Sequence, residues 1–160
     1  MQRFRGKTVI VTGAGSGIGA AVARRFGAEG ANLVLADNSA TGLASAMSQL
    51  DPARALQLKT DVSQLQDVQE MVAATVARFG AIDVLVSNAG ISIKKPFAQV
   101  TLEDWRTTMA VDLDAAFYCA QAALPHLIES KGSIIYTASV SGLGGDWGMT
   151  AYNAAKGGLA

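Results

Sequence analysis

A glycine-rich stretch, TGAGSGIG at residues 12–19, directly follows the apolar run TVIV. The β-branched run predicts a buried strand over Thr8–Val11, and the composition that follows predicts a helix over Gly17–Glu29. Between them, glycine permits a tight turn and leaves no Cβ to block an incoming group. Backbone N–H groups and the positive end of the helix dipole converge at such a point. The stretch therefore indicates an anion-binding turn, although a glycine turn taken alone is a weak signal.

Short apolar runs alternate with helical segments along the rest of the chain. Further strands are predicted over Asn32–Ala36, Leu56–Lys59, Val84–Ser87 and residues 133–139. Helices are predicted over Ser39–Leu50, over Leu65–Phe79 with Ser63 as its cap and Gly80 closing it, and from Thr101, in a capping box with Asp104, to about Ile128. Uniformly apolar strands separated by helices imply a parallel sheet covered on both faces. The predicted fold class is α/β, a doubly wound, Rossmann-like parallel sheet in a single domain over residues 1–160.

Charge and cysteine content restrict the classes of function. The 13 basic and 13 acidic side chains cancel, so no overall field draws the protein to nucleic acid or to anionic lipid. Cys119 is the only cysteine, which indicates a reducing compartment, and its apolar helical surroundings favour a packing thiol over a reactive one. No signal-type segment is found, and no apolar run approaches the ~20 residues of a membrane span. We expect a cytoplasmic protein with no nucleic-acid, membrane or metal partner.

Asp37 follows the second strand, eighteen residues after Gly19. A carboxylate in this place can accept hydrogen bonds from the adenosine ribose hydroxyls and would repel a 2′-phosphate. No Arg or Lys follows within the next few residues, and Ser16 in the glycine turn is not basic. NAD is therefore favoured over NADP as the cofactor. Without the glycine turn, Asp37 would be interpreted as an ordinary solvated turn residue.

Tyr152 and Lys156 lie four residues apart at a predicted helix start, so both side chains share one face. An ammonium group near a phenol favours the phenolate. Tyr152 could then take the hydroxyl proton of an alcohol while hydride leaves the adjacent carbon. Ser139, at the carboxyl end of the fifth strand, would hold the substrate oxygen, and Lys156 would also reach the nicotinamide ribose. Each residue singly also has a structural explanation, as a turn serine, a packing aromatic and a surface lysine.

Five motifs in order resemble the short-chain dehydrogenase/reductase family from Lys7 onward. They are Gly13-x-x-Ser16-Gly17-Ile18-Gly19, Asp61-Val62, Asn88-Ala89-Gly90, Ser139, and Tyr152-x-x-x-Lys156. The resemblance implies that the first three motifs bind or flank the cofactor, with Asp61-Val62 at the adenine, and that Ser139, Tyr152 and Lys156 are catalytic. It also implies an alcohol or ketone substrate and, for the full-length protein, a homo-oligomer.

Asp112 departs from the family pattern. The family has Asn in a Val-Asn-Leu context where this chain has Val111-Asp112-Leu113, and the resemblance implies that this Asn supports a water-linked proton relay to the lysine. Asp112 could still accept a hydrogen bond, and it could pair with Lys156, hold its charge and disfavour the Tyr152 phenolate. We expect the Asp112→Asn variant to keep activity within a few-fold or to improve it. A loss of orders of magnitude would give Asp112 a role of its own.

The chain ends at Ala160, about a turn into the helix of Tyr152 and Lys156, whereas family members continue with two more strands and a substrate loop. Either the sequence is part of a longer protein or it is a truncated product, and the intact catalytic set favours the first. The fifth strand would leave an exposed sheet edge. The leading hypothesis is an NAD-dependent oxidoreductase acting on a secondary alcohol or ketone. The alternatives are a dinucleotide-binding fragment without turnover and an interaction module that uses the sheet edge.

Overall fold

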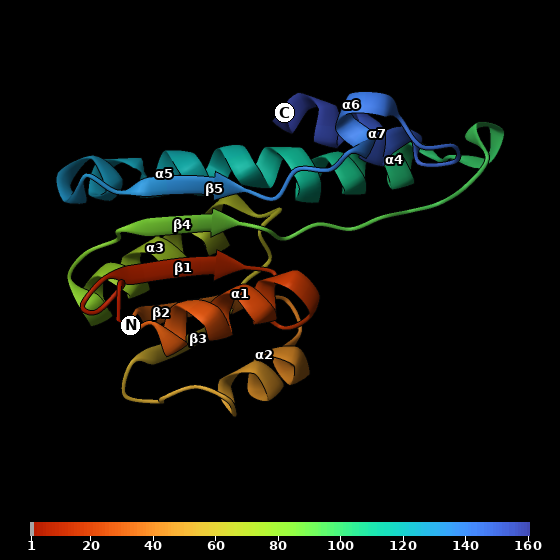
Figure 1. Cartoon of the computed structure of the whole chain (residues 1–160). Helices are drawn as coiled ribbons and strands as arrows, with labels where there is room; N and C mark the ends of the chain where they lie inside the picture. The colour runs from red at the N-terminus through yellow and green to blue at the C-terminus, as the bar shows by residue number, and fades with distance from the viewer. Residues whose placement is uncertain (1) are drawn as a thin grey trace.

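Five parallel strands form one sheet in the computed structural model, which describes residues 2–160. The strand order is β3-β2-β1-β4-β5 (Figure 1). The bounds are β1 Thr8–Thr12, β2 Asn32–Asp37, β3 Ala55–Lys59, β4 Val84–Ser87 and β5 Ser133–Tyr136. Each neighbouring pair is in parallel register, which a chain achieves by crossing over through a helix between strands. The predicted parallel sheet is confirmed.

Helices cover both faces of this sheet. One face packs against α1 (Gly17–Ala28) and α2 (Ala40–Met47), and the other against α3 (Leu65–Phe79) and α5 (Ala115–Ser130). Successive strand residues point to opposite faces. In β1, accordingly, Val9 and Val11 belong to the first core and Ile10 to the second, all fully buried. This two-sided burial applies to the central strands β1, β2 and β4 and explains why these strands are uniformly apolar. The helices on both faces make the sheet doubly wound.

The remaining helical segments gather beyond the carboxyl ends of the strands. They are η1 (Phe97–Gln99), α4 (Leu102–Met109), the π-helical turn η2 (Ala110–Asp114), α6 (Ser141–Gly144) and α7 (Thr150–Leu159). Figure 1 shows α4, α6 and α7 together at the end toward which the strand arrows point. The helix α7 packs against α4, η2 and α6. The α7 helix is thereby held over the edge of the sheet where ligands of parallel α/β folds bind.

The predicted helical region from Thr101 to about Ile128 is confirmed, because α4, η2 and α5 together cover residues 102–130. The capping box is present, because Thr101 Oγ1 accepts the Asp104 N–H at 3.0 Å and the Asp104 carboxylate accepts the Thr101 N–H at 2.9 Å. The helix is interrupted, however, by η2 between α4 and α5. A π-helical turn holds one extra residue and is common at functional sites. Its middle residue is Asp112.

The predicted boundaries of three elements are wrong. Ser63 does not cap α3, since the N-cap position is Gln64 and Ser63 instead donates from its N–H and its hydroxyl to Asp61 Oδ1. The strand predicted over 133–139 ends at Tyr136, where its partner β4 also ends. Ser139 therefore lies three residues beyond the strand. The helix predicted over Ser39–Leu50 is shorter at both ends, with Ser39 as the N-cap of α2.

Two further expectations concern the role of Cys119 and the presence of membrane-spanning helices. Cys119 is a buried residue of α5 and packs into the core, and burial raises the pKa of its thiol to about 12, which agrees with a packing role. Within residues 2–160, no helix combines the length and the apolar character needed to cross a membrane.

Candidate active site

A cleft of about 510 Å³ opens at the carboxyl ends of β1 and β4. These strands are neighbours in the sheet, but the chain leaves them in opposite directions, toward β2 on one side and β5 on the other. Such a switch point leaves a crevice between the loops. The cleft is lined by every predicted cofactor-binding residue except Gly19, namely Gly13, Ser16, Gly17, Ile18, Asp37, Asp61, Val62, Asn88, Ala89, Gly90, Tyr152 and Lys156.

The glycine turn leaves room at the N-terminus of α1. Gly13 and Gly17 have φ values of +64° and +52°, in the left-handed region that favours glycine. A Cβ on Gly17 would meet nothing within 4 Å, so it would project into free space at the helix N-terminus. Gly19 lies beneath the turn instead, where a Cβ would overlap the Gly13 carbonyl oxygen. The turn thus fits a pyrophosphate, because backbone and helix dipole face an unobstructed space.

Asp37 is held at the rim of the cleft by two backbone groups. Its Oδ2 accepts the Gly15 N–H and its Oδ1 accepts the Ser39 N–H, both at 2.8 Å. A Cβ on Gly15 would lie 2.9 Å from Asp37 Oδ2, so this glycine is required for the contact. Sequence reasoning did not assign Gly15 a role, although it stands within the glycine-rich stretch. The contact presents a carboxylate beside the turn.

Asn88 ties three strands together beside the cleft. Its Nδ2 donates to the Thr12 carbonyl at 3.0 Å, and its Oδ1 accepts the Thr137 hydroxyl at 3.1 Å. The Thr12 hydroxyl oxygen in turn accepts the backbone N–H groups of Asn88 and Ala89. Side chains from the ends of β1, β4 and β5 therefore fix one another. Sequence reasoning missed both threonines, which carry no motif and whose partners are distant in the chain.

Tyr152 and Lys156 reach the cleft from α7. The buried residues Ala151 and Ala155 seat this helix, and Lys156 is itself only 4% exposed. Its Nζ donates to the Thr137 carbonyl at 3.0 Å and lies 5.6 Å from the centroid of the Tyr152 ring. This burial excludes the alternative explanation of Lys156 as an ordinary surface lysine.

Ser139 and Asp112 do not line the cleft. Ser139 is half-buried in the loop after β5, and its Oγ accepts the Ser141 N–H at 3.2 Å. Asp112 is 2% exposed and lies behind Lys156, with its Oδ1 accepting the Ile91 N–H at 2.8 Å. Burial raises the pKa of the Asp112 carboxyl, against the opposing effects of the Ile91 N–H and of Lys156. Asp112 thus contacts two residues that line the cleft, Ile91 and Lys156. The hydrogen bond of Ser139, by contrast, is to Ser141, which does not line the cleft.

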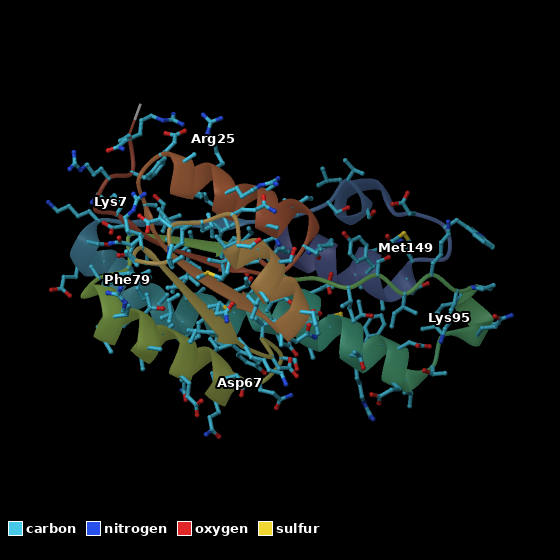
Figure 2. The ribbon with its side chains drawn as sticks, turned by 90° about the horizontal axis from the view of Figure 1, so that it is seen from below. Lys7, Arg25, Asp67, Phe79, Lys95 and Met149 are labelled. Carbon is cyan, nitrogen blue, oxygen red and sulfur yellow. The ribbon has the colours of Figure 1, made fainter. Side chains whose placement is uncertain are left out.

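The loop before α7 is attached to the segment after β4. The Lys95 N–H donates to the Gly148 carbonyl at 2.8 Å, and the Lys95 ammonium pairs with Asp104 at 2.7 Å. Figure 2 shows Lys95 and Met149 at one end of the molecule, opposite Lys7 and Phe79. Trp147 in this loop is 81% exposed. In residues 2–160, no group of His, Cys, Asp and Glu side chains is placed to hold a metal ion.

Comparison with known proteins matches this architecture. The family model described as short chain dehydrogenase matches residues 7–160. Meso-2,3-butanediol dehydrogenase of Serratia marcescens is 46% identical over 156 residues, which are 98% of this chain and 62% of that protein. A 2,5-dichloro-2,5-cyclohexadiene-1,4-diol dehydrogenase of Sphingobium indicum is 40% identical over 149 residues, 91% of this chain and 59% of that protein.

A solved structure shows the same fold. It is a crystal structure from Brucella melitensis described as a short-chain dehydrogenase/reductase, glucose/ribitol dehydrogenase. It superposes with a TM-score of 0.94 at 41% identity, over 98% of this chain and 66% of that one. The chain thus spans less than two thirds of the length of each of these three proteins. A family model that matches nearly the whole chain, together with the sheet order and the glycine turn at its switch point, shows that the chain belongs to the short-chain dehydrogenase family.

Proposed function

We propose that this protein is an NAD(H)-dependent oxidoreductase that interconverts a secondary alcohol and a ketone. The observation that carries the proposal is that Tyr152 and Lys156 line the same cleft as the glycine turn. The proposed proton-transferring residue, Tyr152, and the proposed dinucleotide-binding turn would therefore share one cleft. The relatives named as diol dehydrogenases support an alcohol as the substrate. In this role residues 1–160 would act as one dinucleotide-binding domain.

The residues that would hold the cofactor are distributed along the cleft. The glycine turn and the N-terminus of α1 would bind the pyrophosphate through backbone N–H groups. Asp37 would accept hydrogen bonds from the adenosine ribose, and Asp61 and Val62 would lie at the adenine. Lys156 would reach the second ribose. The negative charge of Asp37 favours NAD over NADP, because it opposes a 2′-phosphate.

The proton would be handled by the side chains of this chain. A bound nicotinamide would supply the hydride acceptor for alcohol oxidation and the hydride donor for ketone reduction. Tyr152 would take the hydroxyl proton of the alcohol in the first direction and return a proton to the ketone oxygen in the second. Ser139 Oγ accepts the Ser141 N–H, and its hydroxyl group would donate its own proton to the substrate oxygen. Ser139 would thereby orient the substrate.

Turnover by the full-length protein tests this proposal. We expect NADH to bind, as followed by its fluorescence, and we expect NAD reduction with a panel of secondary alcohols that includes vicinal diols. The Tyr152→Phe variant should lose about 10²–10⁴-fold in kcat while still binding NADH, since only the proton-transferring hydroxyl is removed. Tyr136→Phe is the matched control and should keep its activity, because Tyr136 lies on the edge strand and is 40% exposed.

Two outcomes would contradict the proposal. Binding of NADH without turnover of any alcohol or ketone would reduce the protein to a dinucleotide-binding module. Failure to bind either dinucleotide would remove the cofactor role altogether.

We further infer a cytoplasmic homo-oligomer. The exposed Phe117 and Ile128 on α5 support the homo-oligomer, because apolar side chains of this size fit a subunit interface.

A further inference from the structure

Asp112 carries a buried oxygen atom that has no hydrogen-bond partner. Its Oδ1 is satisfied by the Ile91 N–H at 2.8 Å, whereas its Oδ2 is shielded from solvent and accepts no hydrogen bond. Buried carboxylate oxygens are costly unless a partner compensates them. The π-helical turn η2 directs this side chain inward, toward α7. The atom that it faces there is Lys156 Nζ, at 3.6 Å.

Lys156 needs a counter-charge as much as Asp112 does. The side chains of Lys156 and Asp112 are 5% and 0% exposed. Among residues 2–160, the hydrogen bond that the ammonium makes is to the Thr137 carbonyl. A neutral carbonyl does not balance the charge of a buried ammonium. In the described part of the chain, Asp112 is the one acidic side chain within 4 Å of this ammonium.

Gly90 makes room for the two groups to approach each other. A Cβ at Gly90 would lie 3.1 Å from Asp112 Oδ2 and 3.4 Å from Lys156 Nζ, in contact with both charged atoms. The absence of this Cβ leaves the ion pair unobstructed. Among the side chains of residues 2–160, Lys156 is the charged group that acts on Asp112. Tyr152 is the further titratable group that α7 contributes beside Lys156.

We propose that Asp112 is an ionised counter-ion of Lys156, a positioning residue that holds the ammonium and offsets its charge toward Tyr152. The family pattern implied by the resemblance has a neutral Asn at this position, where this chain carries a carboxyl group. An ammonium that is paired stabilises a nearby phenolate less than a free one does. Asp112 therefore weakens the influence of the ammonium on Tyr152, which an Asn would not do. The functional consequence rests on the proposed function, but the charge pairing does not.

The ionisation of Tyr152 in the full-length protein without cofactor or substrate tests the pairing. It is followed by phenolate absorbance, as the difference between each protein and its Tyr152→Phe counterpart. In Asp112→Asn we expect the midpoint to move to lower pH by about one unit, the size of effect that one nearby charge produces. Asp114→Asn is the matched control, since Asp114 lies in the same turn but is exposed. Its midpoint should not move.

A purely structural role for Asp112 would predict no shift in either variant, and that result would overturn the proposal, as would a shift to higher pH. A second measurement does not depend on the folding of Asp112→Asn. Carboxyl ¹³C resonances of labelled aspartate should show one buried carboxylate, ionised at neutral pH, whose titration midpoint rises when Lys156 is replaced by Gln. If no aspartate responds to that replacement, the ion pair does not exist.

Turnover separates this proposal from the proposed function. In an active protein, the acidic limb of the kcat/KM profile for alcohol oxidation should move to lower pH in Asp112→Asn by the same amount as the Tyr152 midpoint, with the plateau within a few-fold of the unsubstituted protein. A Tyr152 shift in a protein that turns over no substrate would support the pairing and contradict the proposed function. Turnover with an unchanged kcat/KM profile in Asp112→Asn would support the proposed function and contradict the pairing.

Discussion

Asp37 shows how much a single side chain can decide in this cleft. Its two oxygens accept the backbone N–H groups of Gly15 and Ser39, so its position does not depend on a bound ligand. Its charge, and not its size, is what should discriminate between dinucleotides, because Asn has nearly the same shape. The single carbonyl oxygen of an Asn could accept one of these two N–H groups, and its amide NH₂ could not accept the other.

We therefore predict that Asp37→Asn tightens NADP binding by at least about tenfold, which corresponds to about 1.4 kcal/mol of binding free energy. NAD binding should change by only a few-fold. Competitive displacement of NADH fluorescence measures both affinities. Asp51→Asn is the control, because Asp51 pairs with Arg54 and does not line the cleft. An unchanged ratio of the two affinities would show that the Asp37 charge does not select the cofactor.

At the scale of elements, the start of α4 combines a helix cap with an ion pair. Asp104 completes the capping box with Thr101 and also pairs with Lys95. Its hydrogen bond to Lys95, followed by those to Thr101, lowers the pKa of its carboxyl from 3.8 to about 2. A carboxyl with a lowered pKa in the folded state stabilises the fold above its unfolded pKa. This contribution is lost as the pH falls from about 4 to about 2.

Asp104→Asn should consequently unfold at a temperature a few degrees lower than the unsubstituted protein at pH 7, and the two melting temperatures should converge below about pH 4. Thermal unfolding followed by circular dichroism across this pH range measures the effect. Glu103→Gln removes an exposed carboxylate from the same first turn and should change little. A difference that persists unchanged at low pH would show that the ionised carboxylate is not responsible.

At the scale of the whole molecule, one sheet supports two cores. Leu35 is fully buried on the face of α1 and α2, and Leu85 is fully buried on the face of α3 and α5. Because both layers share the same strands, loss of packing in either should weaken the whole sheet. We predict that Leu35→Ala and Leu85→Ala each lower the free energy of unfolding by about 2–5 kcal/mol in a single cooperative transition.

Urea unfolding followed by both circular dichroism and tryptophan fluorescence checks this expectation. Leu124→Ala is the control, since Leu124 is 47% exposed on α5 and should cost far less. Separate transitions from the two probes, or a core substitution without effect, would show that the two layers do not form one cooperative unit.

Most of the fold could be predicted because its signals are local. The apolar runs at β1 and β4 and the capping box at Thr101 each lie within a few residues of one another in the chain. The end of β5 and the break in the helix after Met109 could not be predicted. A strand ends where its partner ends, and a π-helical turn is stabilised by what the inward side chain contacts, so both depend on distant segments.

The sequence by itself determined the glycine turn, the carboxylate after the second strand, the Tyr152–Lys156 spacing and the doubly wound sheet, because each follows from residue type and short-range periodicity. Only the tertiary structure decided that Asp112 and Lys156 are buried facing each other and that Gly90 leaves them room. The Asp112 carboxylate accepts a hydrogen bond from the N–H of Ile91, which is 21 residues away in the chain. Lys156 donates to the carbonyl of Thr137, which is 19 residues away. Contacts over such separations arise from the packing of whole elements, which no local pattern of residues specifies.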